Sequence, residues 1–437
     1  MKISVIGLGY LGATHAVAMA KLGHEVIGIE PDETRLSALQ SGQVPFYEPG
    51  LEEALLEVQK SGTLTFQAAH DEASAACELH FLCVGTPQLA DSNAADTSYV
   101  FAAASELAAF ISPKAVVAGK STVPVGTALQ LKDEMSKIAG FEVNLAWNPE
   151  FLREGTALED SLKPDRIVVG TWDREAESKL REVYQPILET GTPFISLDVP
   201  TAELVKVAAN SFLATKISFI NAMAEVAEVS GADTVALAEA IGFDERIGKK
   251  FLRNGVGFGG GCLPKDIRAF IARAEELGVG SAVDFLKDID EVNLRRRDRV
   301  VELAKLELED LRDKRILVLG ISFKPDSDDL RDSPSLDVAL RLSALGAKVT
   351  VHDPMALGAL GDRYPELERA KDIETGAKDA ELIFLGTEWS EYKSIDPASF
   401  GDLVANKLII DGRNVLDVAS WQAAGWRLIA LGRNVHN

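Results

Sequence analysis

The stretch GFGGGCLPKD, residues 257–266, sets a cysteine in an unusual place. Cys262 lies between a run of glycines and a Lys-Asp pair. Glycines let the backbone approach a ligand closely, and a cysteine just before a helix is a candidate nucleophile because the helix N-terminus favours its thiolate. We expect Pro264 to be the first residue of a helix that runs to Leu277. The alternative is a buried, inert cysteine, but a glycine run and a Lys-Asp pair do not describe a core strand.

A glycine motif near the start of the chain predicts the binding of a dinucleotide. An apolar run over residues 3–6 ends in GLGYLG, residues 7–12, and a helical pattern then continues to Leu22. A strand pattern over residues 25–29 follows and closes on Glu30. This order, in which a strand, a glycine turn, a helix and a second strand are followed by an acidic residue, is the fingerprint of a dinucleotide-binding unit. Such a unit places the pyrophosphate at the N-terminus of its helix. Glu30 would hold the ribose hydroxyls and repel a 2′-phosphate, so NAD is preferred over NADP. The alternative is that the glycines only form a tight turn.

Polar turns follow three later strand patterns. They are Thr86-Pro87 after residues 79–84, Ser121-Thr122-Val123-Pro124 after residues 115–120, and Asn148-Pro149-Glu150 after residues 143–147. In a parallel α/β sheet the carboxyl ends of the strands line the ligand crevice. We therefore expect these turns to face the same ligand as the glycine motif.

A long helix is predicted in the middle of the chain. Residues 200–230 contain no internal breaker and keep a helical apolar stripe. About thirty residues give roughly 45 Å of helix, enough to bridge two domains or to build a dimer core. Lys206 and Asn210 are four positions apart and share one face of this helix.

The C-terminal third repeats the α/β pattern. After Asp313 the sequence RILVLGISFK predicts a strand, and a helix near residues 335–345 and the strand AKVTVHDP follow. ELIFLGTEW in this part echoes ELHFLCVGT at residues 78–86. The glycine turn is degraded after Gly320, so this domain should bind something other than a second dinucleotide. The predicted fold is α/β, with two Rossmann-like doubly wound domains (residues 1–198 and 301–437) joined by a long central helix in an all-helical middle domain (residues 199–300).

Composition narrows the classes of function. A chain of 437 residues exceeds the size of one hydrophobic core, and its net charge of −22 disfavours binding to nucleic acid or to an anionic membrane. Cys77, Cys83 and Cys262 are too scattered for a disulfide framework or a zinc cluster, so we expect no metal and a reducing cytoplasm. The apolar start could mimic a signal peptide, but charged and glycine-rich sequence follows at once. No apolar run is long enough to span a membrane.

The motifs, in their order along the chain, resemble those of the nucleotide-sugar 6-dehydrogenases, the family of UDP-glucose and GDP-mannose dehydrogenases. The motifs that carry the resemblance are GLGYLG, CVGTP, STVPVGT, NPEFLREG, the helix with Lys206 and Asn210, GFGGGCLPKD, SFKPDSDDLRDSP and DGR at residues 411–413. The resemblance covers nearly the whole chain, and residues 148–170 are more similar to the UDP-glucose branch. One departure is Gly261, where the family commonly has serine before the nucleophile.

The resemblance implies oxidation of the C6 alcohol of UDP-glucose to a carboxylate, with two NAD used in succession. Cys262 would hold the aldehyde as a thiohemiacetal and then as a thioester. Lys206 and Asn210 would donate to the oxygen that becomes anionic, and Asp266, with a bound water, and Lys206 would accept protons in the first oxidation. Glu150, assisted by Thr122 and supported by Glu154, would activate the hydrolytic water. Alternatively, the two glutamates are a solvated pair at a helix start.

The resemblance also implies where the ligands bind. The cofactor contacts would be Gly7, Gly9, Tyr10, Leu11, Gly12, Glu30, Arg35, Val84, Gly85, Thr86, Thr122, Glu154, Lys265 and Arg331. The substrate contacts would be Glu150, Phe151, Leu152, Arg153, Lys206, Asn210, Phe251, Gly257, Phe258, Gly259, Lys324 and Arg413, with Arg246 donated by the neighbouring subunit of a homodimer. NAD would bind the first domain and the nucleotide of the sugar the third, with the reaction in the cleft between them.

Three other interpretations remain open from the sequence. The same enzyme could act on GDP-mannose or an N-acetylated UDP-hexosamine. A two-electron dehydrogenase also joins a Rossmann domain to a helical one, but needs no nucleophilic cysteine. A non-catalytic NAD sensor could keep the fold, although it would be expected to lose at least one of the reactive side chains present here.

Overall fold

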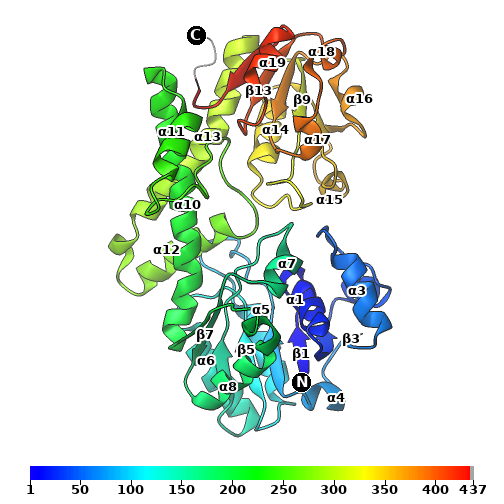
Figure 1. Cartoon of the computed structure of the whole chain (residues 1–437), viewed down its shortest axis with the longest axis vertical. Helices are drawn as coiled ribbons and strands as arrows, with labels where there is room; N and C mark the ends of the chain where they lie inside the picture. Colours follow the sequence, from blue (N-terminus) through cyan, green and yellow to red (C-terminus); the bar gives the residue numbers. More distant parts are fainter. Residues whose placement is uncertain (434–437) are drawn as a thin grey trace. The chain divides into compact units, whose positions relative to one another are not determined.

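The computed structural model describes residues 1–433 and divides into two compact units. Unit 1 comprises Met1–Ala209 and Arg268–Gly280, and unit 2 comprises Asn210–Ile267 and Ser281–Asn437. Each unit contains one β-sheet (Figure 1). Two α/β sheets with a mainly helical stretch between them in the sequence confirm the predicted fold class.

The sheet of unit 1 has eight strands in the order β3-β2-β1-β4-β5-β6-β7-β8. The strands are β1 Lys2–Ile6, β2 Glu25–Ile29, β3 Leu64–Gln67, β4 Leu79–Leu82, β5 Val116–Gly119, β6 Asn144–Trp147, β7 Ile167–Thr171 and β8 Phe194–Leu197. Only the β6–β7 pair is antiparallel. The order of the first six strands, 3-2-1-4-5-6, is that of the doubly wound sheets that bind dinucleotides, and it agrees with the predicted doubly wound fold.

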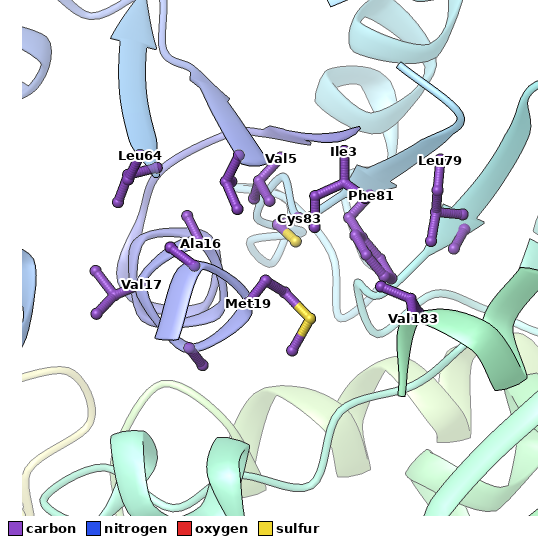
Figure 2. Close-up of a cluster of buried hydrophobic side chains, with 14 of the residues drawn as sticks. Ile3, Val5, Ala16, Val17, Met19, Leu64, Leu79, Phe81, Cys83 and Val183 are labelled. Carbon is purple, nitrogen blue, oxygen red and sulfur yellow. The ribbon is translucent and has the colours of Figure 1, made fainter. Parts of the chain in front are cut away.

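Alternating side chains build a core on each face of this sheet. Ile3 and Val5 pack on one face, while Ile6 of the same strand packs on the other. Figure 2 shows the first core, where Met19 of the first helix lies near strand residues such as Ile3. Burial on both faces explains why these strands read as continuous apolar runs in the sequence.

The sheet of unit 2 repeats this topology with six parallel strands in the order β11-β10-β9-β12-β13-β14. The strands are β9 Arg315–Leu319, β10 Lys348–His352, β11 Glu368–Arg369, β12 Leu382–Leu385, β13 Leu408–Asp411 and β14 Arg427–Ala430. Strand β4 pairs with β1, and β12 pairs with β9, so the two segments that echo each other in the sequence occupy equivalent places in their sheets.

Helices make up most of the remaining structure. Those of unit 1 are α1 Tyr10–Lys21, α2 Glu33–Gln40, α3 Leu51–Lys60, α4 Glu72–Ala75, α5 Ser98–Ala108, α6 Thr127–Ala139, α7 Ala157–Leu162, α8 Arg174–Val183 and α9 Gln185–Leu188. Those of unit 2 are α11 Thr234–Gly242, α13 Phe285–Leu308, α14 Pro334–Ala344, α15 Leu357–Leu360, α16 Ile373–Ala377, α17 Ser390–Lys393, α18 Pro397–Phe400 and α19 Val418–Ala423. Helices α10, Val199–Ser230, and α12, Leu263–Glu276, contribute to both units, and a 3-10 turn covers Gly280–Ala282.

The two helices that carry predicted site residues agree closely with the sequence pattern. Helix α10 has 32 residues and begins one position before the predicted start. The expectation for α12 was wrong by one residue at each end, because Leu263 precedes Pro264 in the helix and Glu276 is its last residue. Gly278 takes a positive φ of 76° and ends the helical path. Among residues 1–433, none of the helices combines the length and apolar character that crossing a bilayer requires.

Candidate active site

The GLGYLG turn has the geometry of a dinucleotide site. Gly7 has a φ of +82°, which favours glycine, and a Cβ on Gly12 would lie 1.8 Å from the Gly7 carbonyl oxygen. Gly9 precedes α1, and a Cβ built on it meets no atom within 4 Å. Open space at the N-terminus of α1 fits a pyrophosphate that approaches the backbone closely. The residues present therefore fit NAD.

Glu30 places a buried carboxylate beside this turn. Its side chain lies at the end of β2 and accepts hydrogen bonds from the backbone N–H of Leu8, at 2.9 Å, and of Asp32, at 3.0 Å. The Arg35 guanidinium lies 3.0 Å from it. The structure thus brings together two of the predicted cofactor residues, Glu30 and Arg35, next to the glycine turn.

The polar turns after β4 and β5 meet each other in unit 1. The Val84 Cγ2 atom would lie 2.9 Å from a Cβ on Gly7, so the β4 turn lies against the glycine turn. The Thr86 hydroxyl donates to the Thr122 carbonyl oxygen at 2.7 Å. This is the meeting of strand ends that a parallel sheet predicts.

Glu150 and Lys206 form a shielded ion pair in unit 1. Their Oε1 and Nζ atoms are 3.0 Å apart, and the exposed fractions of the side chains are 12% and 6%. Glu150 also accepts a hydrogen bond from the Leu152 N–H at 2.7 Å. The Arg166 guanidinium lies over the aromatic ring of Phe151, with the Arg166 Cζ atom 3.9 Å from the ring centre. A carboxylate and an amine held this way can exchange a proton or orient a water molecule.

Cys262 stands at the N-terminus of α12, in unit 2. Its carbonyl oxygen accepts the first helical hydrogen bond, from the Asp266 N–H at 2.9 Å. Asp266 is 1% exposed and accepts from Asn210 Nδ2 at 2.6 Å and from Lys265 Nζ at 2.5 Å. Cys262 is exposed, whereas Cys77 and Cys83 are buried. Burial raises the pKa of both buried thiols to about 12, which makes them poor nucleophiles.

Arg413 links the glycine loop to the turn after β9 in unit 2. Its guanidinium donates to the carbonyl oxygens of Gly257, at 3.1 Å, and of Phe323, at 3.2 Å. Gly257 has a φ of +101°, and Phe258 is buried. A Cβ on Gly259 would lie 2.3 Å from the Asp332 carbonyl oxygen, so the glycine is needed for close packing. Lys324 follows Phe323 directly, with its amine 5.6 Å from that ring.

Gly261, the departure from the family pattern, makes room for an arginine. A Cβ on Gly261 would lie 2.3 Å from the Arg331 Cζ atom. Arg331 forms a bidentate pair with Asp329, and its side chain is 63% exposed. Gly261, the departure from the family pattern, and Arg331, a predicted cofactor contact, are therefore neighbours in unit 2.

Two other predicted residues, Arg153 and Arg246, pair with aspartates that are close to them in the sequence, and a third, Phe251, is partly exposed. Arg153 pairs with Asp160 and Arg246 with Asp244, and the Arg246 side chain is 88% exposed. Phe251 has a φ of +63° and is 37% exposed. Arg153 belongs to unit 1, and Arg246 and Phe251 belong to unit 2.

Sequence reasoning missed three buried charged residues that support the site in unit 1. Lys120, at the end of β5, donates to Asn148 Oδ1 at 3.0 Å. Glu203, on α10, accepts from the Gly126 and Ala128 N–H groups, both at 2.8 Å, at the start of α6. Glu48 lies in the turn before α3 and is 6% exposed. The only signal in the sequence was a charge next to an apolar run or a proline.

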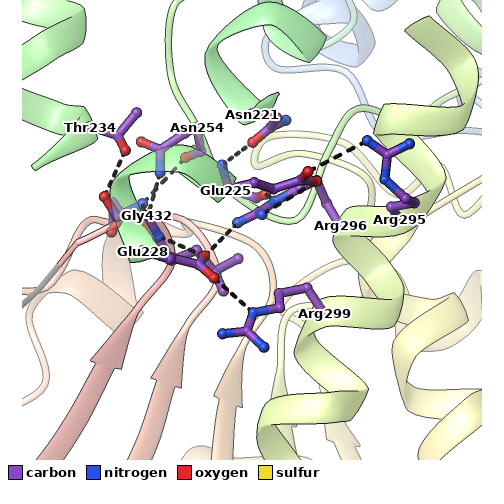
Figure 3. Close-up of polar contacts among 12 residues, drawn as sticks. Asn221, Glu225, Glu228, Thr234, Asn254, Arg295, Arg296, Arg299 and Gly432 are labelled. Atoms are coloured by element: carbon purple, nitrogen blue, oxygen red, sulfur yellow. Dashed lines mark hydrogen bonds and ion pairs between the residues drawn. The ribbon is translucent and has the colours of Figure 1, made fainter. Parts of the chain in front are cut away.

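The glycine loop of unit 2 rests on a polar network (Figure 3). Arg296 of α13 is fully buried and donates to the Gly255 carbonyl oxygen at 3.3 Å and to Glu228 at 3.2 Å. Asn221 of α10 accepts from the Gly255 N–H at 2.9 Å. Asn254 donates to the Leu431 carbonyl oxygen at 2.7 Å. Helices α10 and α13 thus fix the backbone that leads to Cys262.

Models of a known family match three successive parts of the chain. The UDP-glucose/GDP-mannose dehydrogenase family matches with its NAD binding domain over residues 1–188, its central domain over residues 200–295 and its UDP binding domain over residues 317–418.

Individual proteins match the chain over its whole length. The UDP-glucose 6-dehydrogenase of Rhizobium meliloti (strain 1021) is 38% identical over 99% of this chain and 100% of that protein. The UDP-glucose 6-dehydrogenase YwqF of Bacillus subtilis (strain 168) is 37% identical over 99% of this chain and 98% of that protein. The structure of a UDP-glucose dehydrogenase from Pyrobaculum islandicum matches with a TM-score of 0.89 and 39% identity, over 99% of this chain and 97% of that one.

Proposed function

We propose that this chain, which belongs to the UDP-glucose/GDP-mannose dehydrogenase family, catalyses the NAD-dependent four-electron oxidation of UDP-glucose to UDP-glucuronate. Full-length relatives at 37–38% identity that are named UDP-glucose 6-dehydrogenase support the substrate. The observation that carries the covalent route is the exposed Cys262 at the N-terminus of α12, beside the buried pair of Asn210 and Asp266.

The first oxidation converts the C6 alcohol to an aldehyde. When bound, NAD supplies the hydride acceptor in each of the two oxidation steps. The proton that the C6 hydroxyl loses is taken up by a water on Asp266 and by Lys206, which becomes a neutral amine when its own proton passes to Glu150. Asn210 has a second amide N–H beside the one it gives to Asp266, and this donor stabilises the developing negative charge on oxygen.

Cys262 then holds the aldehyde for the second oxidation. Its sulfur forms a bond to C6, and the thiol proton passes to the aldehyde oxygen, which gives a thiohemiacetal. Loss of the second hydride and of the hydroxyl proton leaves a thioester. Glu150 takes a proton from water, the hydroxyl group adds to the thioester carbon, and the C–S bond breaks to release the carboxylate and the Cys262 thiol. Glu154 and Thr122 support this water.

We assign the binding of the nucleotide part of the substrate to residues 301–437. Lys324 and Arg413 concentrate positive charge there in a chain whose net charge is −22. Residues 1–198 bind NAD, and residues 199–300 carry Lys206, Asn210 and Cys262. Because the reaction requires a reduced thiol, we propose a reducing compartment such as the cytoplasm.

We further propose that the enzyme is a homodimer. Apolar side chains on α10 are exposed in unit 2: Phe212 at 67%, Phe219 at 49% and Val226 at 56%. Their spacing of seven residues places them on one stripe of the helix, where a second copy would cover them. Arg246, which is 88% exposed, is available to reach the site of that copy.

The first test is the number of NADH molecules formed per UDP-glucose consumed. We expect two NADH and UDP-glucuronate from the wild type. Cys262→Ser should form no UDP-glucuronate, whereas Cys77→Ser, the same change at a buried cysteine, should keep the product. One NADH per substrate, with Cys262→Ser as active as the wild type, would refute the covalent route and indicate a two-electron dehydrogenase.

A further inference from the structure

Glu48 is a buried carboxylate that the proposed reaction does not use. It lies in the turn between α2 and α3 and is 6% exposed. It accepts hydrogen bonds from the backbone N–H groups of Gly155 and Ala157, each at 2.6 Å, and from the Tyr10 hydroxyl. Burying a carboxylate is costly unless donors surround it, so a side chain with three donors is held in a fixed orientation.

The donor from Tyr10 connects Glu48 to the dinucleotide turn. Tyr10 is the tyrosine of GLGYLG and the first residue of α1, and its ring packs on Phe46 with centres 4.7 Å apart. Burial and the hydrogen bond to Glu48 raise the pKa of Tyr10 well above its usual range. The hydroxyl therefore stays protonated and serves as a donor at physiological pH.

The two backbone donors belong to the segment that carries the proposed hydrolytic groups. We name residues 148–157 the NPEF segment; it includes Glu150 and Glu154. Gly155 and Ala157 lie at its end, where their N–H groups bind Glu48. At its start, Asn148 accepts hydrogen bonds from Lys120 Nζ at 3.0 Å and from the Tyr184 hydroxyl at 2.6 Å.

We propose that Glu48 is a positioning residue that ties the end of the NPEF segment to the dinucleotide turn and so holds Glu150 and Glu154 in place for hydrolysis of the thioester. The inference rests on the proposed function, because it needs the thioester as an intermediate. Both ends of the segment are fixed by buried polar groups, and the Glu48 end is the one joined to GLGYLG through Tyr10. When a group that activates water is displaced by 1 Å, the rate of the step falls about 100-fold.

The test is a rapid-mixing measurement of NADH formation by the full-length enzyme with saturating NAD and UDP-glucose. Glu48→Gln replaces one acceptor oxygen by an amide NH2 group, which cannot accept from Gly155 or Ala157. We expect this variant to form two NADH per subunit in a fast first phase, because the two hydride losses need no activated water. The following steady-state rate should fall about 10- to 100-fold, because the thioester then waits for hydrolysis. Acid quenching during the steady-state phase should trap the thioester, in which the oxidised sugar is bound covalently to Cys262.

Control variants separate positioning from a loss of folding. Glu53→Gln makes the same chemical change at an exposed site on α3 and should behave as the wild type. Tyr10→Phe keeps the ring on Phe46 and removes only one of the three donors, so it should lower the steady-state rate relative to the first phase, but by less than Glu48→Gln does. This variant carries the test if Glu48→Gln does not fold.

Two results would overturn the inference. One is unchanged kinetics of Glu48→Gln, and the other is a fall of the first phase and the steady-state rate by the same factor, which would limit Glu48 to the dinucleotide turn. A wild type that forms no NADH from UDP-glucose would instead refute the proposed function, before any variant is compared.

Discussion

Lys120 shows what it costs to bury a single cation under the candidate site. The residue is 6% exposed, and its amine donates to Asn148 at 3.0 Å and to the Tyr184 hydroxyl at 3.3 Å. Burial lowers the pKa of Lys120 from 10.5 to about 8, although Cys83 and Glu150 act in the opposite direction. The hydrogen bond to Asn148 therefore fixes the start of the NPEF segment at a cost in stability near neutral pH.

This cost predicts how stability depends on pH. Between the folded pKa of about 8 and the unfolded value of 10.5, the unfolded chain binds more protons than the folded one. The contribution of Lys120 to the free energy of unfolding therefore rises with pH across this window. Relative to Lys120→Met, the wild type should gain about 2 kcal/mol between about pH 7.5 and 9.5, measured by urea unfolding. Lys137→Met, an exposed change on α6, is the matched control. A constant difference between wild type and Lys120→Met would contradict the prediction.

At the scale of elements, the Arg296 network joins α10, α13 and the glycine loop. Glu228 of α10 binds Arg296 at 3.2 Å, Arg299 at 2.8 Å and the Gly432 N–H at 3.1 Å, as Figure 3 shows. Arg296 is fully buried, whereas the Arg299 side chain is 36% exposed. The same carboxylate thus offers one buried and one partly exposed arginine pair for comparison.

Removal of Arg296 should lower the free energy of unfolding much more than removal of Arg299. Arg296→Met leaves the Gly255 carbonyl oxygen and part of the Glu228 charge without their donor, and should cost about 3 kcal/mol of unfolding free energy. Arg299→Met removes a pair that water already screens, and should cost less than about 1 kcal/mol. Urea unfolding followed by tryptophan fluorescence measures both losses. Equal losses would show that burial does not set the strength of this network.

The fold was predictable where the signal is local. The apolar run of residues 3–6, the GLGYLG turn and the apolar stripe of α10 are local signals, because each extends over only a few neighbouring residues or turns. The predicted ends of α12 were wrong by one residue each, because hydrogen bonding in the first and last turns decides where a helix begins and ends. The family resemblance supplied the candidate site residues, and their roles stay predictions.

The supporting residues were not predictable, because their partners are distant in the sequence. Glu48 binds Gly155 across 107 positions, and Glu203 binds Gly126 across 77. Arg296 and Glu228 are 68 positions apart. No period or spacing marks a single charge that meets its donors only after the sheet has formed, and composition predicts such charges to be on the surface.

At the scale of the whole molecule, the excess of negative charge makes the source of each cation important. With a net charge of −22, a diphosphate would be repelled unless arginines and lysines converge on it. Arg413 already gives its donors to three carbonyl oxygens, those of Gly257, Phe323 and Gly386. An arginine from a second copy would add charge that the chain's own loop does not need for folding, and Arg246 is the exposed candidate.

A mixed dimer tests whether Arg246 acts on the neighbouring copy. Co-expression of Arg246→Ala and Cys262→Ser chains with different affinity tags allows the mixed dimer to be purified. If Arg246 acts across the interface, one site combines the intact Cys262 of the first chain with the intact Arg246 of the second, while the other site lacks both. The mixed dimer should then have about half of the wild-type activity, because a two-fold dimer has two equivalent sites. If Arg246 acts within its own chain, both sites are defective and the activity of the mixed dimer does not exceed the mean activity of its parents.

A second change, Phe219→Glu on the exposed stripe of α10, should abolish this rescue by separating the copies, because a charge cannot be buried there unpaired.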